Sequence, residues 1–172
     1  KMSIENEEIM KNKEIEFKCV ISKNEYLKLL KEFDLENNIF LQINHYFDTP
    51  DLKLINDNTV LRIRQKINNF KLTKKTRGEY GADETHIFIT KDEAMNLIEN
   101  GFDAKIIGIP YKVKKMAELK TYRVSTPYKD GTIFFDKSEY YGNTDYEIEY
   151  EVDDIEEGKK IFAEFLKSHN IK

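Results

Sequence analysis

The chain has 172 residues, which is enough for one domain with a sizeable core. Charged residues make up 35% of it and the formal net charge is −4, a balance that argues against a general nucleic-acid binder, which is normally basic overall. The single cysteine, Cys19, excludes an intramolecular disulfide and fits a reducing compartment. No stretch approaches the roughly 20 apolar residues of a membrane span, and the polar first residues lack a signal-peptide core. We therefore expect a cytoplasmic protein without a membrane segment.

Eight strands and at least three helices are predicted along the chain. Residues 1–13 are polar and are expected to form a loosely ordered extension. The first strand is expected at 14–21. Ser22 and Glu25 then have the spacing of a capping box, which begins a helix. The next strand is expected near 40–47.

The middle of the chain is expected to contain a hairpin, with strands at 59–66 and 70–77. A short fifth strand is expected at 84–89. Thr90 and Glu93 form a second capping box, which begins the next helix.

The last third predicts another hairpin, with strands at 119–127 and 131–139, and a final strand at 145–153. Asp154 is expected to cap the last helix. No low-complexity linker interrupts the chain, so a single domain is predicted over residues 1–172. Hairpins with intervening helices indicate an antiparallel α+β protein.

Three of the predicted strands alternate charged and apolar residues with a period of two. These runs are Glu14-Ile15-Glu16-Phe17-Lys18, Leu61-Arg62-Ile63-Arg64 and Tyr146-Glu147-Ile148-Glu149-Tyr150-Glu151. In a strand this alternation sends the charges to one face and the apolar residues to the other. One interpretation is an open sheet whose charged face is solvated. The other is a closed barrel, for which eight strands suffice, with helices outside and the charges inside.

Enclosed cations need a counterion, and a polyphosphate is a natural one. Arg62 and Arg64 offer planar forks for phosphate oxygens, whereas Lys18 and Lys75 act as point charges. Clustered carboxylates raise one another's pKa unless a cation intervenes. Oxygen ligands without a Cys or His cluster favour Mg²⁺ or Mn²⁺ over zinc. Such a set of cations and carboxylates is typical of phosphoryl transfer.

Six motifs occur in a fixed order over about residues 14–166. They are Glu14-x-Glu16-x-Lys18, Tyr46-Phe47-Asp48-Thr49, Leu61-Arg62-Ile63-Arg64, Leu72-Thr73-Lys74-Lys75, Leu119-x-Thr121-x-Arg123 and Glu147-x-Glu149. This ordered set resembles the CYTH superfamily, the triphosphate tunnel metalloenzymes, and most of all its small single-domain bacterial members. The resemblance implies an eight-stranded antiparallel β-barrel, or tunnel, with helices packed outside.

The resemblance also implies the site. Phosphate ligands would be Lys18, Arg62, Arg64, Lys75, Arg77 and Arg123. Ligands of Mg²⁺ or Mn²⁺ would be Glu14, Glu16, Asp136, Glu147 and Glu149. Catalytic roles would fall to Glu16, Lys18 and Glu149. Glu84 matches the acid of the fifth strand, and Lys71 shares the parity of Lys75. A one-residue slip of the fourth strand would exchange Lys75 for Lys74.

The leading functional hypothesis is a divalent-metal-dependent triphosphatase that acts on a small-molecule triphosphate. Inorganic tripolyphosphate, a nucleoside triphosphate and thiamine triphosphate all fit the chemistry, and the scarcity of groups to grip a base favours tripolyphosphate. A CYTH-type adenylate cyclase and a non-catalytic polyphosphate- or nucleotide-binding module are the alternatives. No nucleic-acid or membrane partner is expected. A role for His86 as a proton shuttle is possible but not needed.

Overall fold

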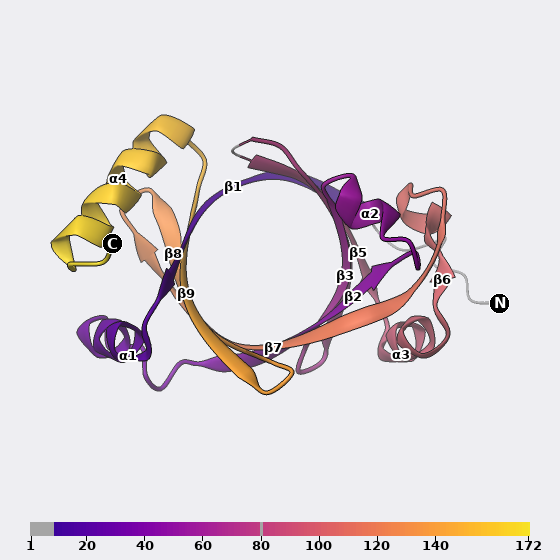
Figure 1. Ribbon diagram of the computed structural model, residues 1–172, viewed down its shortest axis with the longest axis horizontal. Helices are drawn as coiled ribbons and strands as arrows, with labels where there is room; N and C mark the ends of the chain where they lie inside the picture. The colour runs from indigo at the N-terminus through magenta and orange to yellow at the C-terminus, as the bar shows by residue number, and fades with distance from the viewer. Residues whose placement is uncertain (1–8, 80) are drawn as a thin grey trace. The chain divides into compact units, whose positions relative to one another are not determined.

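The computed structural model describes residues 9–79 and 81–172. Its strands form an antiparallel sheet in the order β2-β3-β4-β5-β1-β9-β8-β7-β6, and β2 also pairs with β7. The pairing of β2 with β7 closes eight of these strands, and the two-residue strand β6 is not one of them. The fold class is the expected one, an eight-stranded antiparallel β-barrel with four α-helices outside (Figure 1). The chain divides into two compact units, the first made of Lys1–Lys13 and Gln42–Leu119 and the second of Glu14–Leu41 and Lys120–Lys172.

The elements follow one another as the hairpin pattern predicts. The strands are β1 (Ile9–Ile21), β2 (Phe40–Asp48), β3 (Thr59–Lys66), β4 (Asn69–Arg77), β5 (Gly81–Ile89), β6 (Phe102–Asp103), β7 (Lys112–Tyr128), β8 (Gly131–Tyr140) and β9 (Asn143–Val152). The helices are α1 (Lys23–Glu32), α2 (Lys53–Asn56), α3 (Lys91–Asn100) and α4 (Ile155–Ser168), with a 3₁₀ turn η1 (Ala104–Ile107).

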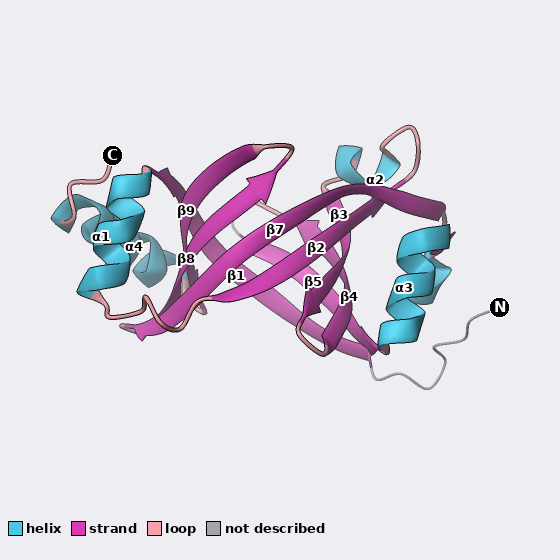
Figure 2. Ribbon diagram, turned by 90° about the horizontal axis from the view of Figure 1, so that it is seen from below, coloured by secondary structure: helices cyan, strands magenta, loops and turns pink. Residues whose placement is uncertain are grey.

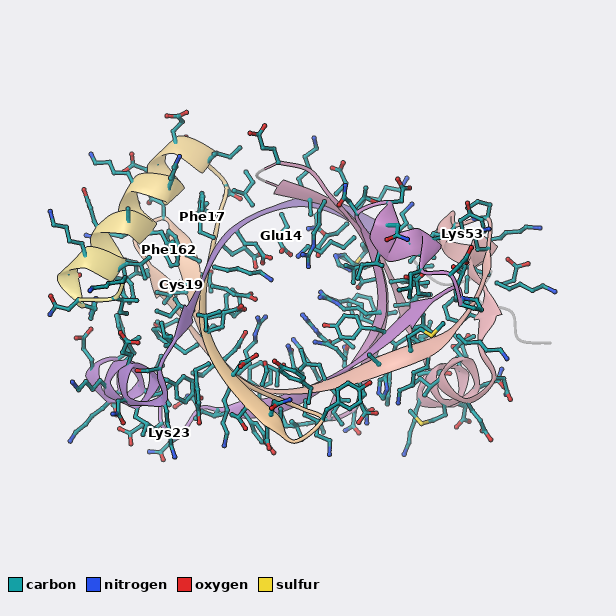
Figure 3. The ribbon with its side chains drawn as sticks, in the orientation of Figure 1. Glu14, Phe17, Cys19, Lys23, Lys53 and Phe162 are labelled. Carbon is teal, nitrogen blue, oxygen red and sulfur yellow. The ribbon has the colours of Figure 1, made fainter. Side chains whose placement is uncertain are left out.

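In the second unit, α1 and α4 pack on one face of β8 and β9 (Figure 1). The apolar residues of the alternating strands form this core, and Tyr150 and Ile148 are almost fully buried. Phe17 on β1 stacks with Phe162 on α4 at 6.1 Å between ring centroids. Glu14 lies on the opposite face of β1, away from α4 (Figure 3). The period-two alternation therefore separates an apolar helix side from a charged side.

In the first unit, the second core lies on one face of β3, β4 and β5. Leu61, Ile63, Leu72 and Ile87 are buried there, together with residues of α3 and η1. Helix α3 lies beside β4 (Figure 2). The opposite face of these three strands carries the charged residues of the alternation.

The helix starts are the expected ones. Ser22 and Glu25 exchange capping-box hydrogen bonds at the start of α1, and Thr90 and Glu93 do so at the start of α3. The carboxylate of Asp154 caps α4. None of the described helices is long and apolar enough to cross a membrane.

Two expectations need correction. Residues 1–8 of the expected loose extension lie outside the described residues, but residues 9–13 belong to β1, which begins at Ile9. Hydrogen bonds between Asn12 and two residues of β5, Glu84 and His86, hold this segment in the strand. The short elements α2, β6 and η1 were not expected, because segments of two to four residues are too short to show a period.

Candidate active site

A charged face of the second unit gathers residues from β1, β7, β8 and β9. Register places them side by side, since Lys18 pairs with Glu149, Asp136 pairs with Glu147, and Arg123 pairs with Asp136. Residues directly opposite each other in antiparallel strands share a face. We call this set the carboxylate face, and it contains Glu14, Glu16, Lys18, Arg123, Asp136, Glu147, Glu149 and Glu151.

Arg123 is held tightly by two carboxylates of this face. Its Nε donates to Asp136 Oδ1 at 2.8 Å, and its Nη2 donates to Asp136 Oδ2 at 2.7 Å and to Glu149 Oε2 at 2.9 Å. The guanidinium also lies 4.4 Å from the centroid of the Phe134 ring. Burial opposes its charge, but the hydrogen bonds that it donates to Asp136 and the charges of Asp136 and Glu149 outweigh burial and raise the pKa of Arg123. This cation therefore already has its counterions.

Lys18 bridges two other members of the face. Its Nζ lies 3.4 Å from Glu149 Oε1 and 3.2 Å from Glu16 Oε1. Burial alone would lower the pKa of Lys18, but the charges of Glu149 and Glu16 reverse this and raise it. Lys18 and Arg123 thus contact Glu149 from two sides.

Glu147 and Glu149 differ in protonation because their neighbours differ. Burial is the main cause that raises the pKa of Glu147 to about 7, and the hydrogen bond with Glu149 adds to it. For Glu149 burial acts in the same direction, but Arg123 and Lys18 outweigh it and lower the pKa. Glu149 is therefore the ionised partner, whereas Glu147 is partly protonated at neutral pH.

The carboxylate face offers two groups that fit a divalent cation. Oxygens of Asp136, Glu147 and Glu149 lie within 4.8 Å of one another, and those of Glu14, Glu16 and Glu151 do the same. Carboxylate oxygens are the ligands that Mg²⁺ and Mn²⁺ prefer. Burial is the main cause of the raised pKa of Glu147, and the charge of Glu149 adds to it, because crowded carboxylates repel one another until a cation or proton intervenes. The donor set fits the expected metal.

The first unit carries an opposite charge on β3, β4 and β5. Register places Arg62 beside Thr73, Arg64 beside Lys71, and Val60 beside Lys75. We call the following set the basic face: Arg62, Arg64, Lys66, Lys71, Lys75 and Arg77. It also includes one acid, Glu84, which pairs with Lys75.

The register of β4 decides between two neighbouring lysines. Phe70 and Leu72 are buried in the core, so Lys75 lies on the basic face and Lys74 on the helix side. The Nζ atom of Lys74 approaches the backbone at Gly108, lying 3.4 Å from the position of a Cβ there. The fourth strand therefore has the register that the motif implied.

Three residues of the basic face differ in their partners. Arg64 Nε donates to Asn44 Oδ1 at 2.9 Å. Among the described residues, the Nε of Arg62 is buried and has no hydrogen-bond partner. Burial, followed by the charges of Arg64 and Arg62, lowers the pKa of Lys71 to about 8. A buried N–H donor and a depressed lysine pKa both indicate a surface that favours an anion.

A polar chain that the sequence analysis missed crosses the middle of this face. Asn12 Nδ2 donates to Glu84 Oε1 at 3.0 Å, so Asn12 Oδ1 faces His86 Nε2 at 2.8 Å as an acceptor. His86 Nε2 must therefore carry a proton, and Nδ1 faces Thr73 Oγ1 at 2.8 Å. Both ring nitrogens of His86 are engaged, which argues against a free proton shuttle. Asn12 was missed because its segment was expected to be loose.

The acid of the Tyr46-Phe47-Asp48-Thr49 motif has a structural role. Asp48 is buried, and its Oδ1 accepts from the backbone N–H groups of Thr49 at 2.7 Å and Leu54 at 3.0 Å. Its Oδ2 accepts from Ile55 N at 3.2 Å. The carboxylate thus fixes the turn into α2, whose N-cap residue makes no side-chain cap bond.

The structure thus places the expected site residues in two groups. The second unit brings together Glu14, Glu16, Lys18, Arg123, Asp136, Glu147 and Glu149. The first unit brings together Arg62, Arg64, Lys75 and Arg77, with Lys71 on the same face as its parity with Lys75 predicts, and the structure adds Lys66. Glu151 also lies on the carboxylate face, as its position two residues after Glu149 in the alternating strand predicts.

The antiparallel strands carry clustered carboxylates in the second unit and a basic face in the first, and comparisons with known proteins identify the family. The sequence model of the CYTH domain family matches residues 12–172. A Bacillus subtilis (strain 168) protein named "Putative triphosphatase YjbK" is 32% identical over 169 residues, which is 92% of this chain and 87% of that protein. The chain belongs to the CYTH domain family.

Solved structures show the same fold. A Bacillus halodurans protein, described as a "putative adenylate cyclase", matches with a TM-score of 0.85 and 34% identity over 94% of this chain and 92% of that chain. A protein from Hippeastrum matches with a TM-score of 0.74 and 22% identity over 94% of this chain and 89% of its own. At that lower identity the match concerns the fold alone.

Proposed function

We propose that the protein is a metal-dependent triphosphatase, which hydrolyses the terminal phosphate of inorganic tripolyphosphate or of a related triphosphate. Membership of the CYTH family supports an enzyme of this kind. The name of the Bacillus subtilis relative supports hydrolysis over cyclisation. The carboxylate groups of the second unit support a divalent metal, and the basic face of the first unit supports a polyanionic substrate.

The carboxylate face is the observation on which this proposal depends. Six carboxylates there share two cations, Lys18 and Arg123. A protein that only bound anions would gain nothing from so many acids, because they repel the ligand. A divalent cation removes this repulsion and draws phosphate to the same place. The proposal therefore includes Mg²⁺ or Mn²⁺ as the cofactor.

Each group of residues has a proposed role. Asp136, Glu147 and Glu149 would hold one metal, and Glu14 and Glu16, which belong to the other carboxylate group, would hold a second. A divalent ion bound there supplies polarisation of the phosphoryl group and a more acidic water. Hydrolysis would add the elements of water across the terminal P–O–P linkage: the terminal phosphorus gains a hydroxyl group, and the bridging oxygen takes up a proton and leaves with the rest of the phosphate chain.

The cations have two proposed roles: some bind phosphate, and others keep the carboxylates ionised and in place. Arg62, Arg64 and Lys75 are the proposed phosphate ligands of the first unit, and Arg77 is the most exposed member of this set. Lys18 is in contact with Glu16 and Glu149, so we assign it to keep both ionised and in place. Arg123 was expected to bind phosphate, but its bonds to two carboxylates favour the same holding role.

Product analysis tests the proposal directly. Purified protein is incubated with tripolyphosphate, ATP or thiamine triphosphate and with Mg²⁺, Mn²⁺ or EDTA. We expect free phosphate from tripolyphosphate only when a metal is present. Glu16→Gln should abolish most turnover while anion binding survives. Unchanged turnover in this variant would contradict the metal assignment.

The role of Arg62 has its own test. Its buried Nε has no partner among the described residues, so a phosphate oxygen would complete its hydrogen bonding. Arg62→Met should weaken tripolyphosphate binding by about 2–4 kcal/mol, the usual cost of losing a buried charged contact. Lys91→Met, at an exposed position of α3, is the matched control. A change within about 0.5 kcal/mol in the Arg62 variant would contradict its assignment.

Adenylate cyclase is the second candidate, and the Bacillus halodurans structure is the observation that favours it. In that reaction the ribose 3′-hydroxyl attacks the α-phosphorus and pyrophosphate leaves. Cyclic AMP and pyrophosphate from ATP would therefore replace the triphosphatase proposal. Binding without any product would favour a non-catalytic module.

A further inference from the structure

A large exposed apolar side chain, Phe88, lies on the basic face. Phe88 on β5 pairs with Lys71 on β4, and Lys71 pairs with Arg64 on β3. In the described residues of β3, β4 and β5, Phe88 is the only large hydrophobic side chain that is exposed, with 39% of its surface accessible. Its neighbours Ile87 and Ile89 point the other way, into the core.

An exposed phenyl ring on a charged face requires an explanation, because the position could carry a polar residue without disturbing the core. Phe88 belongs to neither hydrophobic cluster of the described residues, so it contributes little to packing. A basic surface that tracks phosphates, combined with an aromatic side chain on which a flat ring can stack, is an arrangement that proteins use to bind nucleotides. The ring therefore has the features of a contact for a ligand rather than of a core residue.

The spacing suits a molecule that joins an aromatic group to phosphates. Directly opposite residues of antiparallel strands have their Cβ atoms about 5 Å apart, and neighbouring strands are about 4.8 Å apart. Phe88 is thus one strand from Lys71 and two strands from Arg64. A phosphate chain on these cations would bring an attached flat ring within reach of Phe88.

We propose that Phe88 is a stacking platform for the aromatic head group of an organic triphosphate, such as a nucleobase or the ring system of thiamine triphosphate. The inference rests on the proposed triphosphatase function and names its substrate class more closely. Stacking on an aromatic ring tolerates different bases, since every base has a flat π-face. Phe88 is then a specificity-determining residue that separates organic triphosphates from inorganic tripolyphosphate.

Substitutions at Phe88 test this assignment through a ratio of substrates. Phe88→Ala and Phe88→Leu remove the aromatic ring, whereas Phe88→Trp keeps one. Without the ring, kcat/KM for ATP should fall about fivefold or more, the usual effect of one lost stacking contact, while the value for tripolyphosphate stays within twofold. Phe88→Trp should retain the preference. Equal losses for tripolyphosphate and the organic triphosphates, or no loss for any organic triphosphate, would overturn the proposal.

A comparison of substrates identifies which aromatic head group stacks on Phe88. Similar losses with ATP and GTP would assign a nucleobase, and a loss confined to thiamine triphosphate would assign that ring system. Either result supports the platform, and unchanged values with all three overturn it. Because Phe88 is exposed, the variants should fold like the wild type, which thermal melts followed by circular dichroism will check.

Binding separates this inference from the proposed function. Calorimetry with ATP and tripolyphosphate in EDTA measures affinity without turnover. If the wild type hydrolyses nothing, the triphosphatase proposal fails, yet a weaker affinity of Phe88→Ala for ATP alone still supports the platform. If tripolyphosphate is hydrolysed but Phe88→Ala binds ATP, GTP and thiamine triphosphate as the wild type does, only the platform fails.

Discussion

Replacing Arg123 by Met is expected to destabilise the protein severely. The side chains of Arg123, Asp136 and Glu149 are only 11%, 5% and 11% exposed, and three charge-assisted hydrogen bonds join them. Removing one partner from a buried ion pair leaves an uncompensated charge and costs about 3–5 kcal/mol. We expect a loss of about 4 kcal/mol in the free energy of unfolding at pH 7.

The control variants separate charge from geometry. Arg123→Lys keeps a positive charge but loses the planar fork, so we expect roughly half that loss. Lys129→Met, in the exposed turn between β7 and β8, should change the free energy of unfolding by less than about 0.5 kcal/mol. Urea unfolding followed by circular dichroism measures all three. A loss below about 1 kcal/mol in Arg123→Met would refute the reasoning.

The loss should also depend on pH in a fixed direction. Arg123 and Lys18 lower the pKa of Glu149, so this group stabilises the folded state above its ordinary pKa and less as pH falls. Once Glu149 is protonated, Arg123 has less charge to compensate. The difference between wild type and Arg123→Met should therefore be largest near pH 7 and shrink below about pH 4. An equal difference at both pH values would contradict the charge argument.

Three smaller changes test other parts of the structure. Asp48→Ala should lower the free energy of unfolding by about 3 kcal/mol, because all three hydrogen bonds of the carboxylate are lost. Asp48→Asn should lower it by about 1 kcal/mol, because the amide oxygen can replace Oδ1 and only the bond from Ile55 is lost. Equal losses for the two variants in urea titrations would contradict this. Gly158→Ala should cost about 2 kcal/mol by the same measurement, since its Cβ would lie 2.4 Å from Val152 Cγ2; a negligible loss would show that α4 shifts freely. Tripolyphosphate should raise the pKa of Lys71 from about 8, so the complex should take up a fraction of a proton when it forms at pH 8. Calorimetry in buffers of different ionisation enthalpy measures this proton uptake. Uptake that persists unchanged in Lys71→Met would assign it to another group.

The period-two alternation carried most of the predictive information about the fold. It requires only that charged residues point one way and apolar residues the other, which register and burial confirm for Arg62, Ile63 and Leu72. Capping boxes predicted two helix starts, because the two reciprocal hydrogen bonds depend on residues only three positions apart. Both signals are local, and local signals can be read from a sequence.

Contacts between distant residues could not be predicted in this way. Asn12 reaches Glu84 and His86 across more than 70 positions, and nothing near Asn12 in the sequence indicates its partners. Arg123 likewise meets Glu149 through pairing of three strands, so its engagement by carboxylates was not foreseen. A motif gives the identity of such residues, whereas their counterions depend on tertiary structure.

The crowded carboxylates of the second unit explain why a metal should stabilise the protein. The carboxylate face has more acids than cations, and repulsion by Glu149 adds to the burial that raises the pKa of Glu147 to about 7. A divalent cation would relieve that repulsion, so Mg²⁺ should raise the free energy of unfolding by about RT ln(1 + [Mg²⁺]/Kd). In Arg123→Met the face has lost a cation, and Mg²⁺ should therefore recover more stability than it gives to the wild type. Urea titrations of both proteins in EDTA and in excess Mg²⁺ measure this difference, with Glu149→Gln as the variant that should respond least. Equal stabilisation of all three proteins would show that Mg²⁺ binds elsewhere, and the metal assignment would have to be abandoned.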